Sequence, residues 1–260
     1  MKNELVKPIV RVGNSAGVLL PREWLNGTAR VELLKKPLNL NKEILEILEP
    51  YLEDTLGVYL TGSYARGEET ERSDIDVLVI TNKTNKQIKN GKYNIILILK
   101  DNLEETLNNN ILPILPMLIE AKPIMNAELT KGYRDTPLTK KNMAYYIETT
   151  KSALGVNKAI IESDKELSKG CSDAVAYSLI LRLRSYYIID CIINGKKWNN
   201  KELIGLIKSV SGSEAAYEGY IRGKDKKKQT QELPTEEAEK IYIYVERGIK
   251  KHEEWLARKK

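Results

Sequence analysis

The sequence predicts an α+β protein with a small N-terminal β hairpin unit, an α/β domain with a short mixed sheet, and a C-terminal all-α bundle. Short apolar runs separated by Gly and Asn define the first part, residues 1–36. In the second part, residues 37–128, strand-length apolar runs alternate with helical patterns. The third part, residues 129–260, has helical periodicity and no convincing strand.

The composition indicates a globular chain, because 42% of the residues are hydrophobic and 30% are charged. A formal net charge of +6 suits an anionic partner such as a nucleotide or a nucleic acid, without deciding between them. Cys171 and Cys191 belong to no C-x-x-C pattern, so reduced buried thiols are expected. The start has no signal-peptide pattern, and the most apolar stretch, residues 174–193, contains three charges. We therefore expect a cytoplasmic protein with no membrane span.

The first part has the pattern of three short strands. Residues 8–12 and 18–20 are apolar runs on either side of a turn at 13–17, where Gly and Asn tolerate positive φ. Pro21 begins a helical turn, and apolar residues alternate with charged ones over 29–33, which predicts a third strand.

The string V-G-N-S-x-G-V-x-L-P, from Val12 to Pro21, resembles the swapped-hairpin domains of the AbrB and MazE type. Those domains are DNA-binding dimers, often antitoxins or regulators. The resemblance implies an intertwined homodimer, because about thirty residues cannot bury a core alone. A structural dimerisation hairpin and a DNA-binding unit both remain open. In the second case the phosphate contacts would come from the basic residues Arg11, Arg22, Arg30, Lys35 and Lys36.

The second part begins after Pro37 with a helix that Asn39 or Asn41 caps and that ends near residue 51. The predicted strands are residues 55–61, 74–80, 93–99 and 123–126. Between them we expect a polar loop at 81–91, a helix at 102–107 capped by Asp101, and a helical piece at 112–121 broken by prolines.

A glycine-rich turn and an acidic strand start lie between the first two of these strands. The turn is G-S-Y-A-R-G at 62–67, and the next strand opens with S-D-I-D at 73–76. Residues i and i+2 of a strand share a face, so Asp74 and Asp76 project together. Two carboxylates on a strand suit Mg²⁺, which prefers hard oxygen ligands. Ser63 and the N–H groups after Gly62 lie where a helix start would hold a phosphate.

This pattern resembles the minimal nucleotidyltransferases of the polymerase-beta-like superfamily. The resemblance implies Mg²⁺-dependent transfer of a nucleoside monophosphate from an NTP, with ATP expected, to a hydroxyl of a protein, a tRNA end or a small molecule. It implies catalytic and metal-binding roles for Asp74 and Asp76, and nucleotide-binding roles for Gly62, Ser63, Arg66 and Ser73. For Arg66 an ion pair with the local acidic cluster is the alternative, namely Glu68, Glu69 and Glu71.

The family places a third carboxylate on the next long strand, and this chain has Asn94 there. An amide oxygen can bind a metal, but it carries no charge and cannot act as a base. Three interpretations remain: an active enzyme with altered metal binding, substitution by another acid such as Asp101, or nucleotide binding without turnover. The last would make the chain a DNA-binding regulator or antitoxin-type protein that senses a nucleotide.

The third part predicts a helical bundle around one central helix. Residues 173–193, opened by Ser172, are apolar nearly all round and should form that helix. The other predicted helices start at Thr139, Asn200, Ser213 and Thr235 as caps. This layout resembles the HEPN domains. Arg247 and His252 have the spacing of the HEPN ribonuclease motif, whereas a packed histidine and a surface arginine are the alternative.

Overall fold

The computed structural model describes residues 5–34, 39–71 and 73–259, which fall into two compact units, Met1–Leu40 and Asn41–Lys260. Lys35, Lys36 and the boundary at Pro37 lie outside the described residues. Within the described ranges, no helix is both long enough and apolar enough to cross a membrane. Each unit is described separately below.

The N-terminal unit is a two-stranded antiparallel hairpin, β1 (Ile9–Val12) and β2 (Ser15–Val18), followed by a 3-10 turn, η1 (Arg22–Trp24). The turn is shorter than predicted, because Gly13 takes a φ of +57° and lets Val12 pair directly with Ser15. The predicted third strand over 29–33 was wrong: these residues have no regular structure. A strand needs a hydrogen-bonding neighbour, and the described part of a single chain offers none to this segment.

The hairpin unit has no buried core of its own. No residue between 5 and 34 is buried. Several large apolar side chains are 67–72% exposed, namely Val6, Leu19, Leu25, Val31 and Leu34. This agrees with the expectation that so short a segment cannot bury a core alone.

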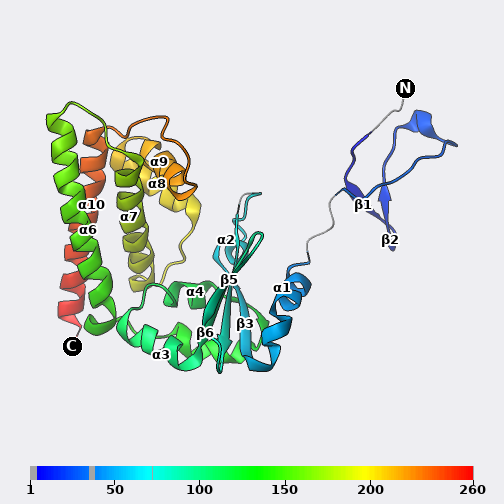
Figure 1. Ribbon diagram of the computed structural model, residues 1–260, viewed down its shortest axis with the longest axis horizontal. Helices are drawn as coiled ribbons and strands as arrows, with labels where there is room; N and C mark the ends of the chain where they lie inside the picture. The colour runs from blue at the N-terminus through cyan, green and yellow to red at the C-terminus, as the bar shows by residue number, and fades with distance from the viewer. Residues whose placement is uncertain (1–4, 35–38, 72, 260) are drawn as a thin grey trace. The chain divides into compact units, whose positions relative to one another are not determined.

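The second unit contains a five-stranded mixed sheet in the order β5-β6-β4-β3-β7, of which Figure 1 labels β3, β5 and β6. Strands β4 and β6 are parallel, and the other neighbours are antiparallel. The first and third predicted strands have the observed bounds, and the other two are shifted by one residue. The bounds are β3 (Thr55–Thr61), β4 (Ile75–Thr81), β5 (Lys86–Asn90), β6 (Tyr93–Leu99) and β7 (Lys122–Met125).

Strand β5 corrects the prediction of a polar loop over 81–91. Its sequence, K-Q-I-K-N, has no apolar alternation, and all of its residues except Ile88 are exposed. It forms because it pairs along β6 and covers the edge of the sheet.

Helices of this region connect the strands and pack against the sheet. α1 begins directly after Asn39, one of the two predicted caps, and the chain continues as the 3-10 helix η2 around Pro50. α3 starts before Asp101, which lies in its first turn; its N-cap, Leu99, offers no side-chain bond, so the predicted Asp101 cap was wrong. The bounds are α1 (Leu40–Leu48), η2 (Glu49–Asp54), α2 (Gly62–Arg66), α3 (Lys100–Asn109) and α4 (Leu115–Glu120).

The rest of the unit is helical, and α7 is central as predicted, since it packs against α6, α8, α9 and α10. Figure 1 shows α6, α7 and α10 side by side. The segment begins with the short η3 and α5. The bounds are η3 (Ala127–Thr130), α5 (Lys131–Arg134), α6 (Lys140–Glu166), α7 (Asp173–Ile193), α8 (Asn200–Ser211), α9 (Ala215–Lys224) and α10 (Thr235–Arg258).

The helix caps were predicted unevenly. Thr139 and Asn142 form a capping box at α6, which confirms the predicted cap. Asn199, one residue before the predicted Asn200, caps α8, and Thr235 is the first residue of α10 rather than its cap. At α9 the N-cap is Glu214, although the Ser213 hydroxyl still accepts a hydrogen bond from the backbone N–H of Ala215.

One continuous apolar core joins the sheet to the helices of this unit. It runs from Tyr59 and Leu78 on the sheet to Leu179 on α7 and Val245 on α10. Cys171 and Cys191 are free and buried, as predicted. The packing places one face of α7 beside the end of the sheet where β3 and β4 carry the predicted motif.

Candidate active site

The parallel register of β4 and β6 places Asp76 directly beside Asn94. The Asn94 amide donates a 2.9 Å hydrogen bond from Nδ2 to Asp76 Oδ1. The amide nitrogen must face the carboxylate, because an ionised carboxylate only accepts hydrogen bonds. Gln87 on β5 donates to the remaining amide oxygen of Asn94. In this arrangement Asn94 acts as a hydrogen-bond donor to Asp76, and its oxygen is already engaged.

Gly62 lies directly against Asp76, at the point where β3 turns into α2. Its φ is +68°, and a Cβ at this position would lie 2.6 Å from Asp76 Oδ2. Only glycine fits there, for both conformational and steric reasons. The Thr61 hydroxyl donates to the backbone carbonyl of Asp76 at 3.2 Å, which fastens the two strands at this level.

Glu120, at the end of α4, is a carboxylate with only 10% of its side chain exposed, and it organises the glycine turn. It accepts hydrogen bonds from the Gly62 N–H at 2.6 Å, from Arg66 Nη1 at 2.6 Å and from Trp198 Nε1 at 3.2 Å. These donors come from the turn, from α2 and from the segment that joins α7 to α8. Glu120 therefore ties the motif to the helical region.

Arg66 forms two ion pairs and is largely enclosed. Besides Glu120, its Nε donates to Glu68 at 2.8 Å, and only 13% of its side chain is exposed. The second carboxylate oxygen of Glu68 accepts from the backbone N–H of Asn200 at 3.0 Å. The ion pair with the local acidic cluster, foreseen as one alternative, is therefore present through Glu68.

The remaining predicted site residues lie outside the contacts that join Gly62, Asp76 and Asn94. Asp74 directly precedes β4 and is exposed, and it does not line the pocket described below. The Ser73 hydroxyl accepts from the Thr70 N–H at 2.9 Å, and Ser63 is the second residue of α2. Asp101 lies beyond the far end of β6, seven residues after Asn94.

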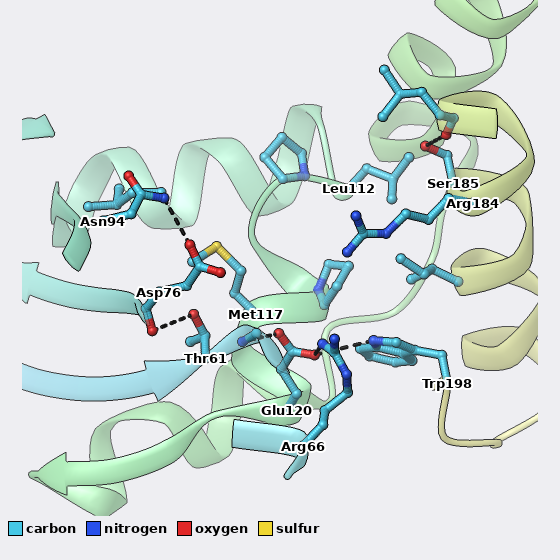
Figure 2. A pocket seen from close by; sticks show the side chains of 16 residues that line it. Thr61, Arg66, Asp76, Asn94, Leu112, Met117, Glu120, Arg184, Ser185 and Trp198 are labelled. Carbon is cyan, nitrogen blue, oxygen red and sulfur yellow. Dashed lines mark hydrogen bonds and ion pairs between the residues drawn. The ribbon is translucent and has the colours of Figure 1, made fainter. Parts of the chain in front are cut away.

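A pocket of about 460 Å³ opens between the end of the sheet and α7 (Figure 2). Its polar and charged groups come from the sheet motif and from the helical region. The other wall is apolar. The lining side chains include Thr61, Arg66, Asp76, Asn94, Glu120, Arg184, Ser185 and Trp198, and the apolar Ile96, Leu112, Pro113, Pro116, Met117, Leu181 and Ile188.

The donor set fits a divalent cation only in part. Asp76 Oδ2 and the exposed carboxylate of Asp74 are hard oxygen ligands, whereas Asn94 turns its amide nitrogen toward Asp76 and its oxygen toward Gln87. Among the described residues no group of three His, Cys, Asp or Glu side chains could hold a metal. A Mg²⁺ ion here would complete its shell with water and substrate phosphate oxygens.

His252 is a core residue and not a surface group. It is 2% exposed on α10, stacks on Tyr186 with ring centroids 4.9 Å apart, and places Nδ1 3.2 Å from the Tyr146 hydroxyl. Burial lowers the pKa of its imidazole to about 4, against a smaller opposing effect of Asp190. Arg247 is exposed on the same helix. This corresponds to the packed-histidine alternative, because a buried imidazole is out of reach of RNA.

Comparison with known proteins gives one family match, in which residues 41–142 fit the model of a nucleotidyltransferase domain. A search of curated proteins found no match. Among solved structures, the chain is similar to a nucleotidyltransferase-like protein from Exiguobacterium sibiricum, with 14% identity, a TM-score of 0.36, and coverage of 82% of this chain and 75% of that one. It is also similar to the spectinomycin adenyltransferase AAD(9) from Enterococcus faecialis, with 14% identity, a TM-score of 0.43, and coverage of 80% and 97%.

The matched range contains the whole predicted motif, from Gly62 to Asn94, and Glu120 as well. It leaves out the N-terminal hairpin unit and most of the helical region. Residues 41–142 are thus similar to a nucleotidyltransferase domain.

Proposed function

We propose that the protein is a nucleotidyltransferase that uses Mg²⁺ to transfer a nucleoside monophosphate from an NTP, with ATP expected, to an acceptor hydroxyl. The observation that carries this proposal is the contact of Gly62 and Asn94 with Asp76 in a pocket of the family-matched domain. The glycine turn and the acidic strand, which are separate in sequence, lie against each other at Gly62 and Asp76, which supports one shared site.

In this proposal Asp74 and Asp76 would hold the metal, which when bound would lower the pKa of an attacking hydroxyl and neutralise phosphate charge. The Gly62 turn, Ser63 and Ser73 bind the nucleotide. Arg66 stays a predicted nucleotide ligand. Its two carboxylate partners also give it a positioning role, because they hold the turn in place.

A label-transfer experiment tests the proposal. The protein is incubated with Mg²⁺ and α-labelled NTPs, with and without cell extract, beside an Asp74→Ala/Asp76→Ala variant. Label that enters the protein, RNA or small-molecule fraction of the extract, and that the variant fails to transfer, supports the enzyme and identifies the class of acceptor. Binding of ATP with no transfer to any fraction contradicts it.

The second candidate function is a nucleotide-binding regulator or antitoxin-type protein without turnover. The engagement of Asn94 with Gln87 and Asp76 favours it, since this site lacks the third carboxylate. The exposed apolar side chains of the N-terminal unit support a homodimer of the AbrB and MazE type, formed through this unit.

DNA binding by that unit would use Arg22 and Arg30, which are exposed, and Arg11, whose Nε donates to the Gly13 carbonyl. The mass in solution and the salt dependence of binding to the protein's own promoter DNA test this function. A monomer would contradict the dimer, and binding that does not weaken with salt would contradict phosphate contacts. The helical region is proposed to be HEPN-like in layout alone, without ribonuclease activity.

A further inference from the structure

Arg184 on α7 is a cation of the pocket without a counter-charge. It is half-buried, and Figure 2 shows its guanidinium pointing into the space between α7 and the strand that carries Asp76. Over the described ranges of the chain, its hydrogen bond is a long one, 3.5 Å from Nη1 to the Tyr220 hydroxyl, and no carboxylate lies within ion-pair distance.

Two other half-buried arginines of this unit, Arg66 and Arg222, are paired with carboxylates. Arg66 is held by Glu68 and Glu120, and Arg222 makes two hydrogen bonds to Asp173 at 2.9 and 3.0 Å. An arginine keeps its charge inside proteins, and an unpaired charge in a partly apolar site is costly. Arg184 therefore differs from both, and an anionic ligand would relieve this cost.

The carboxylates of the same pocket already accept hydrogen bonds from groups of the chain. Glu120 accepts from three donors, and Asp76 uses Oδ1 for Asn94 while Oδ2 faces the glycine turn and the proposed metal. An ammonium group would find no unengaged carboxylate oxygen except the one that the metal needs. Among the described residues of the pocket, the charged group that has no partner of opposite charge, and could therefore bind a charged ligand, is the guanidinium of Arg184.

We propose that Arg184 is the anion-binding residue of this pocket and that it binds an anionic oxygen group, a phosphate or a carboxylate. The inference rests on the proposed function for the origin of the group, which is either the triphosphate of the nucleotide or an anionic acceptor. A guanidinium suits this task, because its planar fork binds two oxygens at once. If the acceptor supplies the group, the substrate class is a small hydroxyl compound that carries a negative charge and an apolar face.

Equilibrium binding in the presence of Mg²⁺ tests the proposal with four probes: ATP, adenosine, tripolyphosphate, and inorganic phosphate added to the ATP-saturated protein. The variants are Arg184→Gln, Arg184→Lys, and Arg247→Gln as a matched control, which removes an exposed guanidinium of α10. Loss of a hydrogen-bonded charged partner predicts roughly 10- to 100-fold weaker binding of the anion in Arg184→Gln. Arg184→Lys keeps the positive charge without the planar guanidinium. Its affinity for the anion should therefore lie between those of the wild type and Arg184→Gln.

If the nucleotide supplies the anion, Arg184→Gln weakens the binding of ATP and of tripolyphosphate and leaves the binding of adenosine unchanged. If the acceptor supplies it, ATP binding is unchanged, and phosphate binding to the ATP-loaded wild type is lost in the variant. An Arg184→Gln protein equal to wild type with every probe overturns the anion site, as does a wild type that binds no anionic probe. If the wild type transfers no label but binds the anionic probes more tightly than Arg184→Gln does, the result contradicts the proposed transferase activity and leaves the anion site standing.

Discussion

Replacement of Asn94 by Asp tests whether this position is the missing third acid. The substitution removes a hydrogen bond to a carboxylate at 2.9 Å and puts a second carboxylate in its place. A hydrogen bond to a charged group contributes about 1.5–3 kcal/mol, and two like charges about 4 Å apart repel by about 4 kcal/mol at an effective dielectric of 20. The site is half-buried, so part of the repulsion is relieved by solvent and by a raised pKa of one carboxyl.

We therefore expect Asn94→Asp to lose about 2–4 kcal/mol of unfolding free energy at pH 7 in EDTA. Mg²⁺ should restore most of this loss, because a paired carboxylate site binds the ion. Thermal unfolding with and without Mg²⁺ measures both effects. Asn94→Ala is the matched control: it loses the hydrogen bond without adding a charge, so Mg²⁺ should stabilise it less than it stabilises Asn94→Asp.

The assignment fails if Asn94→Asp is as stable as wild type in EDTA or if Mg²⁺ does not stabilise it more than it stabilises Asn94→Ala. The label-transfer assay adds a second readout. A third acid should raise turnover, and a variant that binds Mg²⁺ more tightly without faster transfer would show that Asn94 does not limit activity.

Two further predictions concern Gly62 and His252. Gly62→Ala should abolish label transfer, because its Cβ would displace the Asp76 carboxylate. Gly67 also has a positive φ, but a Cβ there would meet open space, so Gly67→Ala should lower the unfolding free energy by about 1–2 kcal/mol without affecting label transfer. Equal loss of label transfer in both variants would contradict a specific role for the contact between Gly62 and Asp76. Because burial lowers the pKa of His252 to about 4, unfolding free energy should fall, by up to about 3 kcal/mol, as the pH falls from about 6.5 to 4. Denaturant unfolding against pH measures this slope, which His252→Leu should remove.

The strands that the sequence predicted well are those buried by the sheet and its helices. β3 and β6 are nearly continuous apolar runs, so their length and limits are visible in the sequence. β5 was missed because an exposed edge strand of Lys, Gln and Asn has no apolar period. The prediction for residues 29–33 was wrong for the opposite reason. These residues alternate like a strand, but a strand also needs a neighbouring strand to hydrogen-bond with, and the alternation of residues does not provide one.

The site residues also differ in this respect: some lie in recognisable sequence motifs, and others reach the pocket only through tertiary packing. Gly62, Asp76 and Asn94 could be placed together from the sequence because their motifs resemble those of the minimal nucleotidyltransferases, and the parallel register of β4 and β6 sets Asp76 beside Asn94. Glu120 and Arg184 could not. They lie in a proline-broken helix and in the middle of an apolar helix, with no motif around them, and only tertiary packing brings them to the pocket.

Position 94 and Arg184 change the charge of the pocket in the same direction. Asn94 is neutral at the position where the resemblance to the minimal nucleotidyltransferases implies a carboxylate, and Arg184 adds one positive charge from α7. Because Coulomb interactions are strong in a half-enclosed apolar pocket, both changes weaken a site for cations and strengthen one for anions. An anionic ligand at Arg184 would also be repelled less by Asn94 than by a carboxylate. The variant Asn94→Asp should therefore weaken anion binding at Arg184 while it strengthens Mg²⁺ binding at Asp76, and opposite responses of the two ligands would show that one pocket holds both sites.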